Sequence, residues 1–328
     1  MKALICTELT PDLSGVSVAD VDMPRIGPSD VLVKNRAACV NFPDLLMTEG
    51  KYQHRPELPF VIGMESAGDV VEVGSAVSGI AVGDRVIVGG KAGGFAEYRA
   101  APDSLVRPIP VGLSYAEAAA HTAGLLTAYV ALVRLGQMQK GETVLVHGAA
   151  GGVGLAAVSL AKHMGARVVA TSASSEKRQW LREIYGGEHV LDTGGHLRDE
   201  VKAIAGPNGI DLCFDPVGGD LFDQSVRCMG FGGRYLVVGF TSGRIPDISV
   251  NYPLIKGFSI IGVRAGEYGR RFPDKGRENI ATIDAFAVAG LKPHIGAQFD
   301  LPEGIEALRR LRFAVLARPL TLAVKTLD

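Results

Sequence analysis

The stretch that decides the fold is His147-Gly-Ala-Ala-Gly-Gly-Val-Gly154. It follows TVLVH (143–147), an apolar run of strand length, and precedes LAAVSLAKH (155–163), which has a helical pattern. A tight glycine turn between a strand and a helix lets backbone N–H groups approach a pyrophosphate at the positive helix N-terminus. Alanine 149 stands where the usual G-x-G-x-x-G pattern has its first glycine. The predicted dinucleotide contacts in this turn are Ala150, Gly151, Gly152 and Val153.

A second strand-like run, ARVVAT (166–171), follows at the spacing of a βαβ unit. An NAD-preferring site usually ends this strand with Asp or Glu for the ribose 2′-OH, whereas small hydroxyl residues stand here. They leave room for a 2′-phosphate, which nearby cations can bind, so the sequence predicts NADP(H). The predicted contacts are Ser172, Ser174, Lys177 and Arg178. Alternatively, the two cations are only the solvated first turn of a helix, where Glu176 interacts with the helix dipole.

The 328 residues predict two domains. Residues 1–124 read as strands and glycine-rich turns, and we expect residues 265–328 to join them in a mostly β domain. In residues 125–264 strands alternate with helices, which predicts an α/β domain with a doubly wound parallel sheet. A helix is expected over 114–135, capped by Ser114. Another is expected near 276–289, and the final strand, LTLAVKTL (320–327), is expected to return to the first domain.

Charge and hydropathy exclude several function classes. The 34 basic and 35 acidic residues give a net charge of -1, which offers no footprint for nucleic acid or an anionic membrane. Apolar stretches such as 236–240 are far shorter than the roughly 20 residues that span a bilayer. The N-terminus has no apolar signal core, so we expect a cytoplasmic protein.

The four cysteines are scattered and form no C-x-x-C pair. This pattern argues against a disulfide framework and against a structural zinc site. Cys6 and Cys213 stand in apolar strands and are expected to be core thiols. Cys228 is the fourth cysteine. Cys39 lies near Asn41 and Asp44 in the sequence and is either a reactive thiol or a core thiol.

Several segments in order resemble one family over essentially the whole chain. They are VNFPD (40–44), LPFVIGME (58–65), VGDRV (82–86), LTAY (126–129), HGAAGGVG (147–154), DPVGG (215–219) and VGFTSG (238–243). The chain resembles the zinc-independent quinone oxidoreductases, the zeta-crystallin-like branch of the medium-chain dehydrogenase/reductase superfamily. The resemblance implies a GroES-like catalytic domain, a Rossmann NADP(H)-binding domain and an NADPH-dependent reductase.

The same resemblance bears on zinc. Zinc-dependent alcohol dehydrogenases have Cys at the position of Asn41, His at that of Met64 and Cys near Ala123, and they carry a four-cysteine lobe where this chain has the short GGKAGG (89–94). A catalytic zinc site needs about three protein ligands, so we expect no metal. His54 and His121 are a scattered pair, more typical of surface or packing roles.

Without a Lewis acid, conjugated acceptors such as quinones and α,β-unsaturated carbonyls are the expected substrates, because they delocalise the charge that hydride addition creates. The resemblance implies that Asn41 donates to the substrate oxygen or fixes the ribose–nicotinamide end of the cofactor. Asp44 either orients this loop or only caps the turn after Pro43. Tyr52 either donates its phenol to the substrate or packs half-buried.

Further cofactor contacts are implied by position. Thr127 resembles a family threonine beside the nicotinamide ribose, or is an ordinary residue of an apolar helix. Val217, Gly239, Phe240 and Thr241 follow consecutive strands, where backbone approaches the dinucleotide. Two segments depart from the family: 315–320 lacks the usual Gly-Lys, and 264–271, specific to a subgroup, is expected to shape the substrate mouth.

Two other functions stay open. An enoyl-thioester reductase, acting on acyl-CoA or a carrier-bound chain, would need a basic entrance, for which Arg264, Arg270 and Arg271 are the sequence support. A non-catalytic NADPH-binding structural protein would bind cofactor and reduce no acceptor. The apolar run 259–263 (SIIGV) predicts a homodimer formed by edge-strand pairing.

Overall fold

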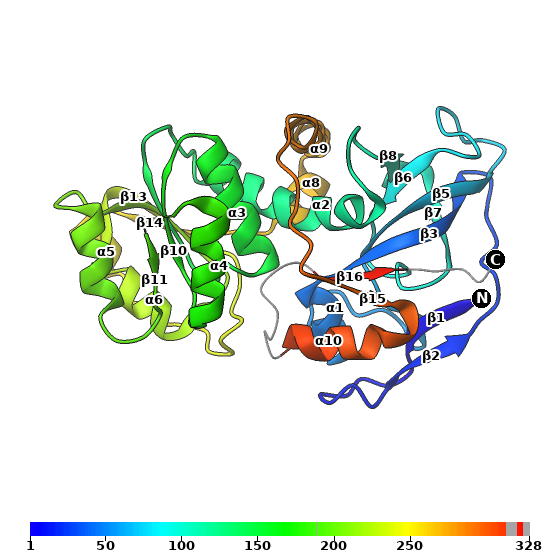
Figure 1. Cartoon of the computed structure of the whole chain (residues 1–328), viewed down its shortest axis with the longest axis horizontal. Coiled ribbons are helices and arrows are strands. Elements are labelled where there is room, and N and C mark those ends of the chain that lie inside the picture. Colours follow the sequence, from blue (N-terminus) through cyan, green and yellow to red (C-terminus); the bar gives the residue numbers. More distant parts are fainter. Residues whose placement is uncertain (188, 313–319, 324–328) are drawn as a thin grey trace. The chain divides into compact units, whose positions relative to one another are not determined.

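The computed structural model describes residues 1–187 and 189–312, and the backbone of 320–323 (Figure 1). The chain divides into two compact units. Unit 1 comprises Met1–Ala123 together with the described residues from Asp284 onward, and unit 2 comprises Gly124–Ile283.

Unit 2 is built on a sheet whose six strands, in the described part of the chain, are all parallel and run in the order β11-β10-β9-β12-β13-β14. The strands are β9 (Thr143–Val146), β10 (Arg167–Thr171), β11 (Val190–Leu191), β12 (Ile210–Asp215), β13 (Met229–Val237) and β14 (Ser259–Gly262). Numbered from β9, this is the order 3-2-1-4-5-6 of the doubly wound dinucleotide-binding fold. The predicted Rossmann class is therefore confirmed.

A helix follows each of these strands in unit 2 (Figure 1). They are α3 (Gly152–His163), α4 (Ser175–Tyr185), α5 (Leu197–Ala205), α6 (Gly219–Ser225), α7 (Asn251–Lys256) and α8 (Ala265–Arg271). Val201 of α5 and Phe222 of α6 pack into one core with Cys213 and Tyr235 of the sheet. Cys213 is thus a core thiol, as predicted.

The predicted 114–135 helix forms as α2 (Tyr115–Tyr129), followed by a π-helical segment, η2 (Val130–Leu135). Ser114 and Glu117 exchange backbone-to-side-chain hydrogen bonds, which confirms the predicted cap. In the described chain this is the one helix long and apolar enough to cross a membrane, and 56% of its apolar window is buried within the structure. The sequence expectation that no apolar stretch reaches that length is therefore wrong, because it counted only uninterrupted apolar residues.

Unit 1 is mostly β and holds two sheets, of orders β2-β1-β4 and β15-β16-β3-β5-β6-β8, with β7 pairing β3. Its strands are β1 (Lys2–Cys6), β2 (Val16–Asp20), β3 (Asp30–Val40), β4 (Phe60–Val61), β5 (Glu65–Val73), β6 (Arg85–Val88), β7 (Tyr98–Pro102), β8 (Val106–Pro108), β15 (Ala297–Asp300) and β16 (Leu320–Ala323). Its remaining elements are α1 (Phe42–Thr48), α10 (Gly304–Arg312) and the 3-10 turns η1 (Asp103–Leu105) and η3 (Leu301–Glu303). Cys6 belongs to its core, as predicted.

The C-terminal strand returns to unit 1. β16 lies parallel to β15 and antiparallel to β3, with Leu320 opposite Val40 (Figure 1). The prediction for the final strand is confirmed over residues 320–323. The sequence departs from the family pattern at 315–320. Residues 315–319 of this segment lie outside the described residues.

The second boundary between the units differs from the predicted one. It falls between Ile283 and Asp284, inside α9 (Pro273–Val288), instead of between 264 and 265. Residues 265–283 belong to unit 2 because they are tied to η2, where Arg134 donates to Asn279 Oδ1 at 2.7 Å and to Glu278 Oε2 at 2.9 Å. The alternation of strands and helices along the sequence does not reveal a contact between side chains that are 145 residues apart.

Candidate functional site

The glycine turn of unit 2 joins β9 to α3 as predicted, but a different residue makes the tight bend. Gly148 has a φ of 56°, in the left-handed region that favours glycine, whereas the φ of Ala149 is not positive. This explains why alanine is tolerated at position 149. A Cβ on Gly154 would lie 2.2 Å from the Gly148 carbonyl oxygen, so only glycine lets the helix approach the turn this closely.

The predicted contacts in the turn are placed at the start of α3. Gly151 is its N-cap in extended conformation, and the first backbone N–H groups of the helix have no intrahelical acceptor. Gly151 and Gly152 are exposed, Val153 is half-buried, and Ala150 is buried. The turn therefore fits a pyrophosphate, which needs close backbone approach and aligned N–H groups.

His147 at the end of β9 has a role that sequence reasoning missed. Its ring is fully buried, with Nδ1 2.9 Å from Thr171 Oγ1 and Nε2 2.7 Å from Ser225 Oγ. Burial lowers the pKa of His147, which keeps the ring neutral. The histidine therefore connects the carboxyl ends of β9 and β10 to α6. A histidine closing an apolar strand was the only available signal.

The end of β10 carries no acid, as predicted, but its two cations differ. Arg178 donates to the carbonyl oxygens of Ser172 and Ala173, each at 2.8 Å, and pairs with Asp192 at 2.9 Å. Its guanidinium therefore holds the loop between β10 and α4, and its contact with a 2′-phosphate stays a prediction. Lys177 is half-buried, and burial lowers its pKa.

The two serines of this loop also differ. The Ser174 hydroxyl caps α4 by accepting from the Lys177 backbone N–H at 3.3 Å. Ser172 is 7% exposed. Both hydroxyls are small and neutral, so the loop presents no carboxylate of its own at the end of β10.

The loops after β12 and β13 meet the glycine turn at the same sheet edge. Val217 lies beside Gly148, since a Cβ there would be 3.3 Å from Val217 Cγ2. The Gly239 N–H donates to the Asp215 carbonyl at 3.3 Å, and the Thr241 N–H donates to the Pro216 carbonyl at 3.1 Å. The structure thus brings four predicted contacts to the carboxyl edge, and they are Val217, Gly239, Phe240 and Thr241.

Asp215 organises this edge. Its Oδ1 accepts from the N–H groups of Val217 and Gly218 at 2.8 and 2.9 Å, and its Oδ2 accepts from the Tyr235 hydroxyl at 2.7 Å. Thr127 is half-buried on α2, whose Gly124, three residues earlier, lies within van der Waals reach of Gly152. The predicted cofactor residues that follow β9, β12 and β13 therefore lie at one sheet edge, and α2 approaches the start of α3 at Gly124.

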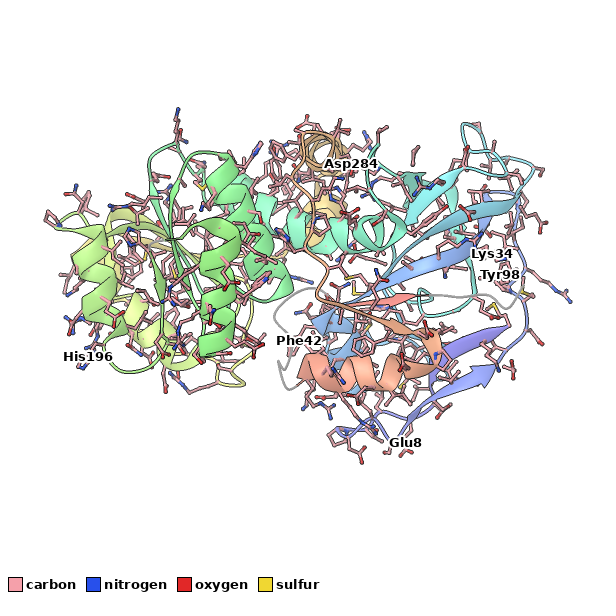
Figure 2. All side chains as sticks on the ribbon, viewed as in Figure 1. Glu8, Lys34, Phe42, Tyr98, His196 and Asp284 are labelled. Carbon is pink, nitrogen blue, oxygen red and sulfur yellow. The ribbon has the colours of Figure 1, made fainter. Side chains whose placement is uncertain are left out.

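In unit 1, Asn41 stands between β3 and α1 and contacts a buried carboxylate (Phe42, which begins α1, is labelled in Figure 2). Its Nδ2 donates to Glu65 Oε1 at 2.9 Å, and its backbone N–H donates to Asp44 Oδ2 at 2.8 Å. Asp44 Oδ1 accepts from the Met64 N–H at 3.1 Å, and Glu65 Oε2 accepts from the Ala123 N–H at 2.8 Å. This backbone bond is part of the capping box of α1, so it fits both the predicted partnership of Asn41 and Asp44 and the alternative that Asp44 only caps the turn.

Sequence reasoning missed Glu65 and Arg99, which complete this cluster. Asp44 is 0% exposed, and Glu65 and Arg99 are each 5% exposed. Arg99 donates to Ser66 Oγ and to the carbonyl oxygens of its neighbours, including Ala92 at 2.9 Å. Burial is the main cause that raises the pKa of Asp44 to about 7, and it also raises the pKa of Glu65 and lowers that of Arg99 to about 10.

The three positions where zinc enzymes carry ligands converge here. Asn41 and the backbones of Met64 and Ala123 all donate to Asp44 or Glu65. Within residues 1–187, 189–312 and 320–323, no group of three or more His, Cys, Asp and Glu side chains is placed to hold a metal ion. His121 is buried against Asp284 at 3.0 Å, which Arg107 also contacts, and His54 is half-buried in the loop after α1.

Two further candidates are resolved by burial. Cys39 is 3% exposed, and burial, with the charges of Glu65 and Asp44, raises the pKa of its thiol well above the usual range. This favours the core thiol over the reactive one. Tyr52 is half-buried against the core of unit 1, and its hydroxyl has no hydrogen-bond partner among the described residues. This packing fits the half-buried alternative, and a hydrogen bond from Tyr52 to a ligand stays a prediction.

The basic cluster expected at 264–271 is paired in part. Arg270 and Arg271 both pair with Glu267 on the short helix α8, at 3.0 and 2.9 Å, while Arg264 is the exposed N-cap. One acid thus serves two of the three arginines. The segment keeps a net positive charge, so the enoyl-thioester alternative stays open.

Comparisons with known proteins agree with this geometry. Residues 27–111 match the family model described as alcohol dehydrogenase GroES-like domain, and residues 152–282 match the one described as zinc-binding dehydrogenase. The chain is 38% identical to a quinone oxidoreductase-like protein 2 homolog of Nematostella vectensis over 94% of this chain and 85% of that protein.

Solved structures agree as well. A probable oxidoreductase of Mycobacterium abscessus has 37% identity and a TM-score of 0.89, with 99% of each chain covered. A mycobacterial protein whose structure was solved in complex with NADPH has 30% identity and a TM-score of 0.86, with 99% of this chain and 100% of that one covered. The likeness to each therefore extends over both units.

Proposed function

Because the chain belongs to the quinone oxidoreductase-like branch of the medium-chain dehydrogenase/reductase superfamily, we propose that it is an NADPH-dependent, zinc-independent reductase of quinones or activated alkenes. The single observation that carries this proposal is the carboxyl edge of unit 2. There a glycine cradle for pyrophosphate stands beside a β10 end that has serines and a lysine instead of an acid. A 2′-phosphate fits such an end better than a 2′-hydroxyl does.

The residues of unit 2 would hold the cofactor, which supplies a hydride when bound. The N–H groups of Gly152 and Val153 would donate to the pyrophosphate, while Lys177 and Ser174 would bind the 2′-phosphate. Arg178 would act indirectly, because its bonds to the carbonyls of Ser172 and Ala173 fix the loop that carries Lys177.

The residues of unit 1 would orient the acceptor. Glu65 accepts one hydrogen of the Asn41 amide group, and the second amide hydrogen remains to donate to a quinone or enone oxygen. Such a donor stabilises the negative charge that develops on that oxygen when hydride adds. A proton from solvent then completes the reduction, so that one hydride and one proton convert a quinone to a hydroquinone.

Zinc independence is part of the proposal and rests on residue types. Asn41, Met64 and Ala123 stand where zinc enzymes supply side-chain ligands, and an amide, a thioether and a methyl group do not make a zinc site. Activity that is unchanged after exhaustive dialysis against a chelator would agree with this. Activity that is lost and then restored by zinc would contradict it.

The decisive experiment is NADPH oxidation with quinones, enones and enoyl-CoAs, beside parallel NADH reactions. We expect turnover of quinones or enones with NADPH preferred. Turnover of enoyl-CoAs alone would establish the thioester reductase instead. Tight NADPH binding with no turnover of any acceptor would establish a non-catalytic, cofactor-binding protein.

Variants then test the role of Asn41. Asn41→Ala is expected to lower kcat about 100-fold, the usual effect of losing one oxyanion donor, with NADPH affinity unchanged. Glu65→Gln keeps Asn41 and disturbs only its partner, so its kcat should fall much less. The exposed Asn251→Ala is the matched control. Equal losses in Asn41→Ala and Glu65→Gln would mean that Asn41 is only structural.

We also propose a homodimer formed through β14. Ile260 on this edge strand is 37% exposed, and Leu254 and Ile255 of the adjacent α7 are 81% and 76% exposed. Pairing with a second copy would cover the open strand edge and this apolar surface. Light scattering at micromolar concentration should give a dimer. Ile260→Lys should give a monomer, whereas a monomeric unmodified protein would contradict the proposal.

We propose a cytoplasmic location because of the state of the cysteines. All four are buried thiols and none forms a disulfide, which suits a reducing compartment. Fractionation of cells that express a tagged chain checks this, and recovery from the membrane or the medium would overturn it.

A further inference from the structure

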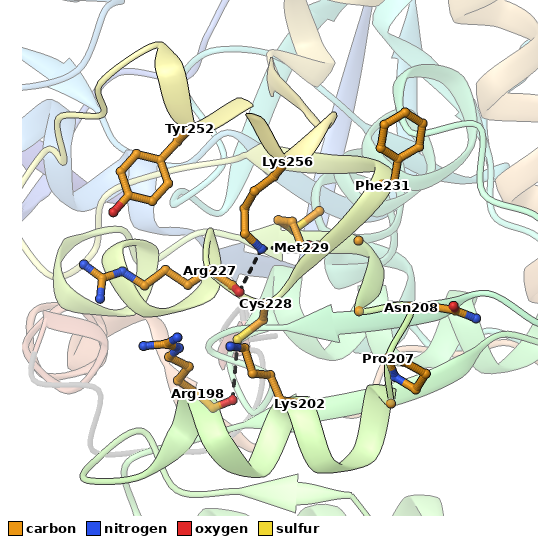
Figure 3. A pocket seen from close by; sticks show the side chains of 13 residues that line it. Arg198, Lys202, Pro207, Asn208, Arg227, Cys228, Met229, Phe231, Tyr252 and Lys256 are labelled. Atoms are coloured by element: carbon orange, nitrogen blue, oxygen red, sulfur yellow. Dashed lines mark hydrogen bonds between the residues drawn. The ribbon is translucent and has the colours of Figure 1, made fainter. Parts of the chain in front are cut away.

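Unit 2 has a hollow at the sheet edge opposite the glycine turn. It has a volume of about 680 Å³ and is formed where β12 and β13 begin, next to α5 and α7 (Figure 3). Because all strands of this sheet are parallel, their amino ends lie at the edge away from Asp215 and Gly239. The hollow is therefore distinct from the cofactor edge. Its volume is in the range of about 300–1,000 Å³ typical of small-molecule sites.

Four cations line this hollow and have no carboxylate partner. Arg198 and Lys202 come from α5, Arg227 follows α6, and Lys256 ends α7. Among the described residues none of the four forms an ion pair, although most other arginines of unit 2 do. Asp199 and Glu200 are on the same helix as Arg198 but do not pair with it. The hollow therefore carries uncompensated positive charge.

Local structure does not account for all four cations. Lys202 and Lys256 lie in the last turns of their helices, where the helix dipole stabilises them. Arg198 lies in the first turn of α5, where the dipole disfavours a cation, and it stands four residues before Lys202, a repulsive like-charge spacing. Burial and the positive charges of Lys202 and Arg198 lower the pKa of Lys256. An anionic ligand would relieve all of these repulsions.

The remaining lining suits a ligand that is more than a bare ion. Lys256 Nζ donates to the carbonyl oxygens of Arg227 and Met229, at 3.0 and 3.2 Å, which fixes its position in the lining (Figure 3). The Phe231 ring is 92% exposed and lies against Gly257, where a Cβ would be 2.5 Å from the ring. Its open face is a platform for a planar group, and Tyr252 adds a second aromatic ring to the lining.

We propose that this hollow binds a small molecule that carries a diphosphate group. Four cations from three segments match the charge of two linked phosphates better than that of one. The site is separate from the dinucleotide edge and does not depend on which coenzyme binds there.

Calorimetric titration with inorganic pyrophosphate and with ADP tests the proposal, with and without saturating NADPH. We expect saturable binding of pyrophosphate that persists when NADPH is present. Tighter binding of ADP would identify a nucleotide as the source, and equal binding would identify a free diphosphate; both results support the site. Binding that NADPH abolishes would place pyrophosphate at the cofactor edge and overturn the proposal.

A matched pair of double variants locates the site. Arg198→Ala with Lys202→Ala should weaken pyrophosphate binding at least about tenfold, since two of four cations are removed. Lys140→Ala with Arg309→Ala removes the same charge from two exposed positions elsewhere and should have no effect. Equal affinities in the two double variants, or no saturable binding to the unmodified protein, would overturn the proposal. This comparison needs no coenzyme, so it is independent of the proposed reductase activity.

Discussion

The carboxyl edge of the unit 2 sheet and the Asn41 cluster of unit 1 are built in contrasting ways. The sheet edge uses glycines, turns and backbone N–H groups from a continuous motif and the loops beside it. The Asn41 cluster uses three buried charged side chains, Asp44, Glu65 and Arg99, which come from three separate segments. The comparison teaches that a site made of backbone groups depends on residues close together in the sequence. A cluster of buried charges depends on residues that only the fold brings together.

Removing the only buried cation of the cluster should have the largest effect. Arg99→Leu deletes a guanidinium that contacts several oxygens and leaves Asp44 and Glu65 without an opposing buried charge. We expect a loss of about 3–5 kcal/mol in the free energy of unfolding, measured by denaturant titration.

Arg271→Leu is the control, because its ion pair with Glu267 is on the surface. The expected change there is within about 1 kcal/mol. Similar losses in both variants would erase the distinction between the two kinds of site.

Filling the glycine cradle should come next. Gly154→Ala places a Cβ against the Gly148 carbonyl, so we expect about 3 kcal/mol of destabilisation, the upper range for overpacking, and a loss of NADPH binding. In Gly151→Ala the nearest atom is 3.3 Å away, so its stability should change little. Thermal unfolding and coenzyme titration measure both effects. A tolerated Gly154→Ala would refute the close approach.

The cluster should make stability depend on pH. Asp44 has a pKa of about 7 in the folded protein against its ordinary 3.8, so between these values the folded state holds a proton that the unfolded state has released. Stability from this group is complete below the lower value and is lost as the pH rises through the higher one. We expect a loss of about 2 kcal/mol between pH 5 and 7.

Asp44→Asn cannot titrate and should flatten this dependence, which denaturant unfolding across that range measures. Asp20→Asn, at an exposed surface pair, should leave it unchanged. An equally steep profile in Asp44→Asn would assign the dependence to another group.

The smallest expected effect is on coenzyme binding, and it distinguishes the roles of Lys177 and Arg178, the two cations after β10. Lys177→Ala should weaken NADPH binding about tenfold, or 1.4 kcal/mol, and leave NADH binding unchanged, because only NADPH carries the 2′-phosphate. Arg178→Ala should weaken both coenzymes alike, since it loosens the loop. Fluorescence titration distinguishes these outcomes. A selective loss of NADPH in Arg178→Ala would restore it as a direct phosphate contact.

The sequence predicted much of the coenzyme edge because the physics there is local. The glycine turn, the loops after the strands and the cap at Ser114 each depend on a few neighbouring residues. The features that the sequence did not predict depend on contacts between residues far apart in the chain. Arg178 meets Asp192 beyond the next strand, and Arg134 holds residues of α9 in unit 2.

The sequence by itself determined the alternation of strands and helices, the dinucleotide turn and the absence of an acid after β10. Hydrophobic periodicity and glycine conformation are short-range properties, so they can be read along the chain. Only the tertiary structure decided that Glu65 and Arg99 surround Asn41 and Asp44, that Gly148 makes the tight bend, and that four cations share one hollow. Burial and electrostatic energies depend on distance in space, which sequence order does not specify.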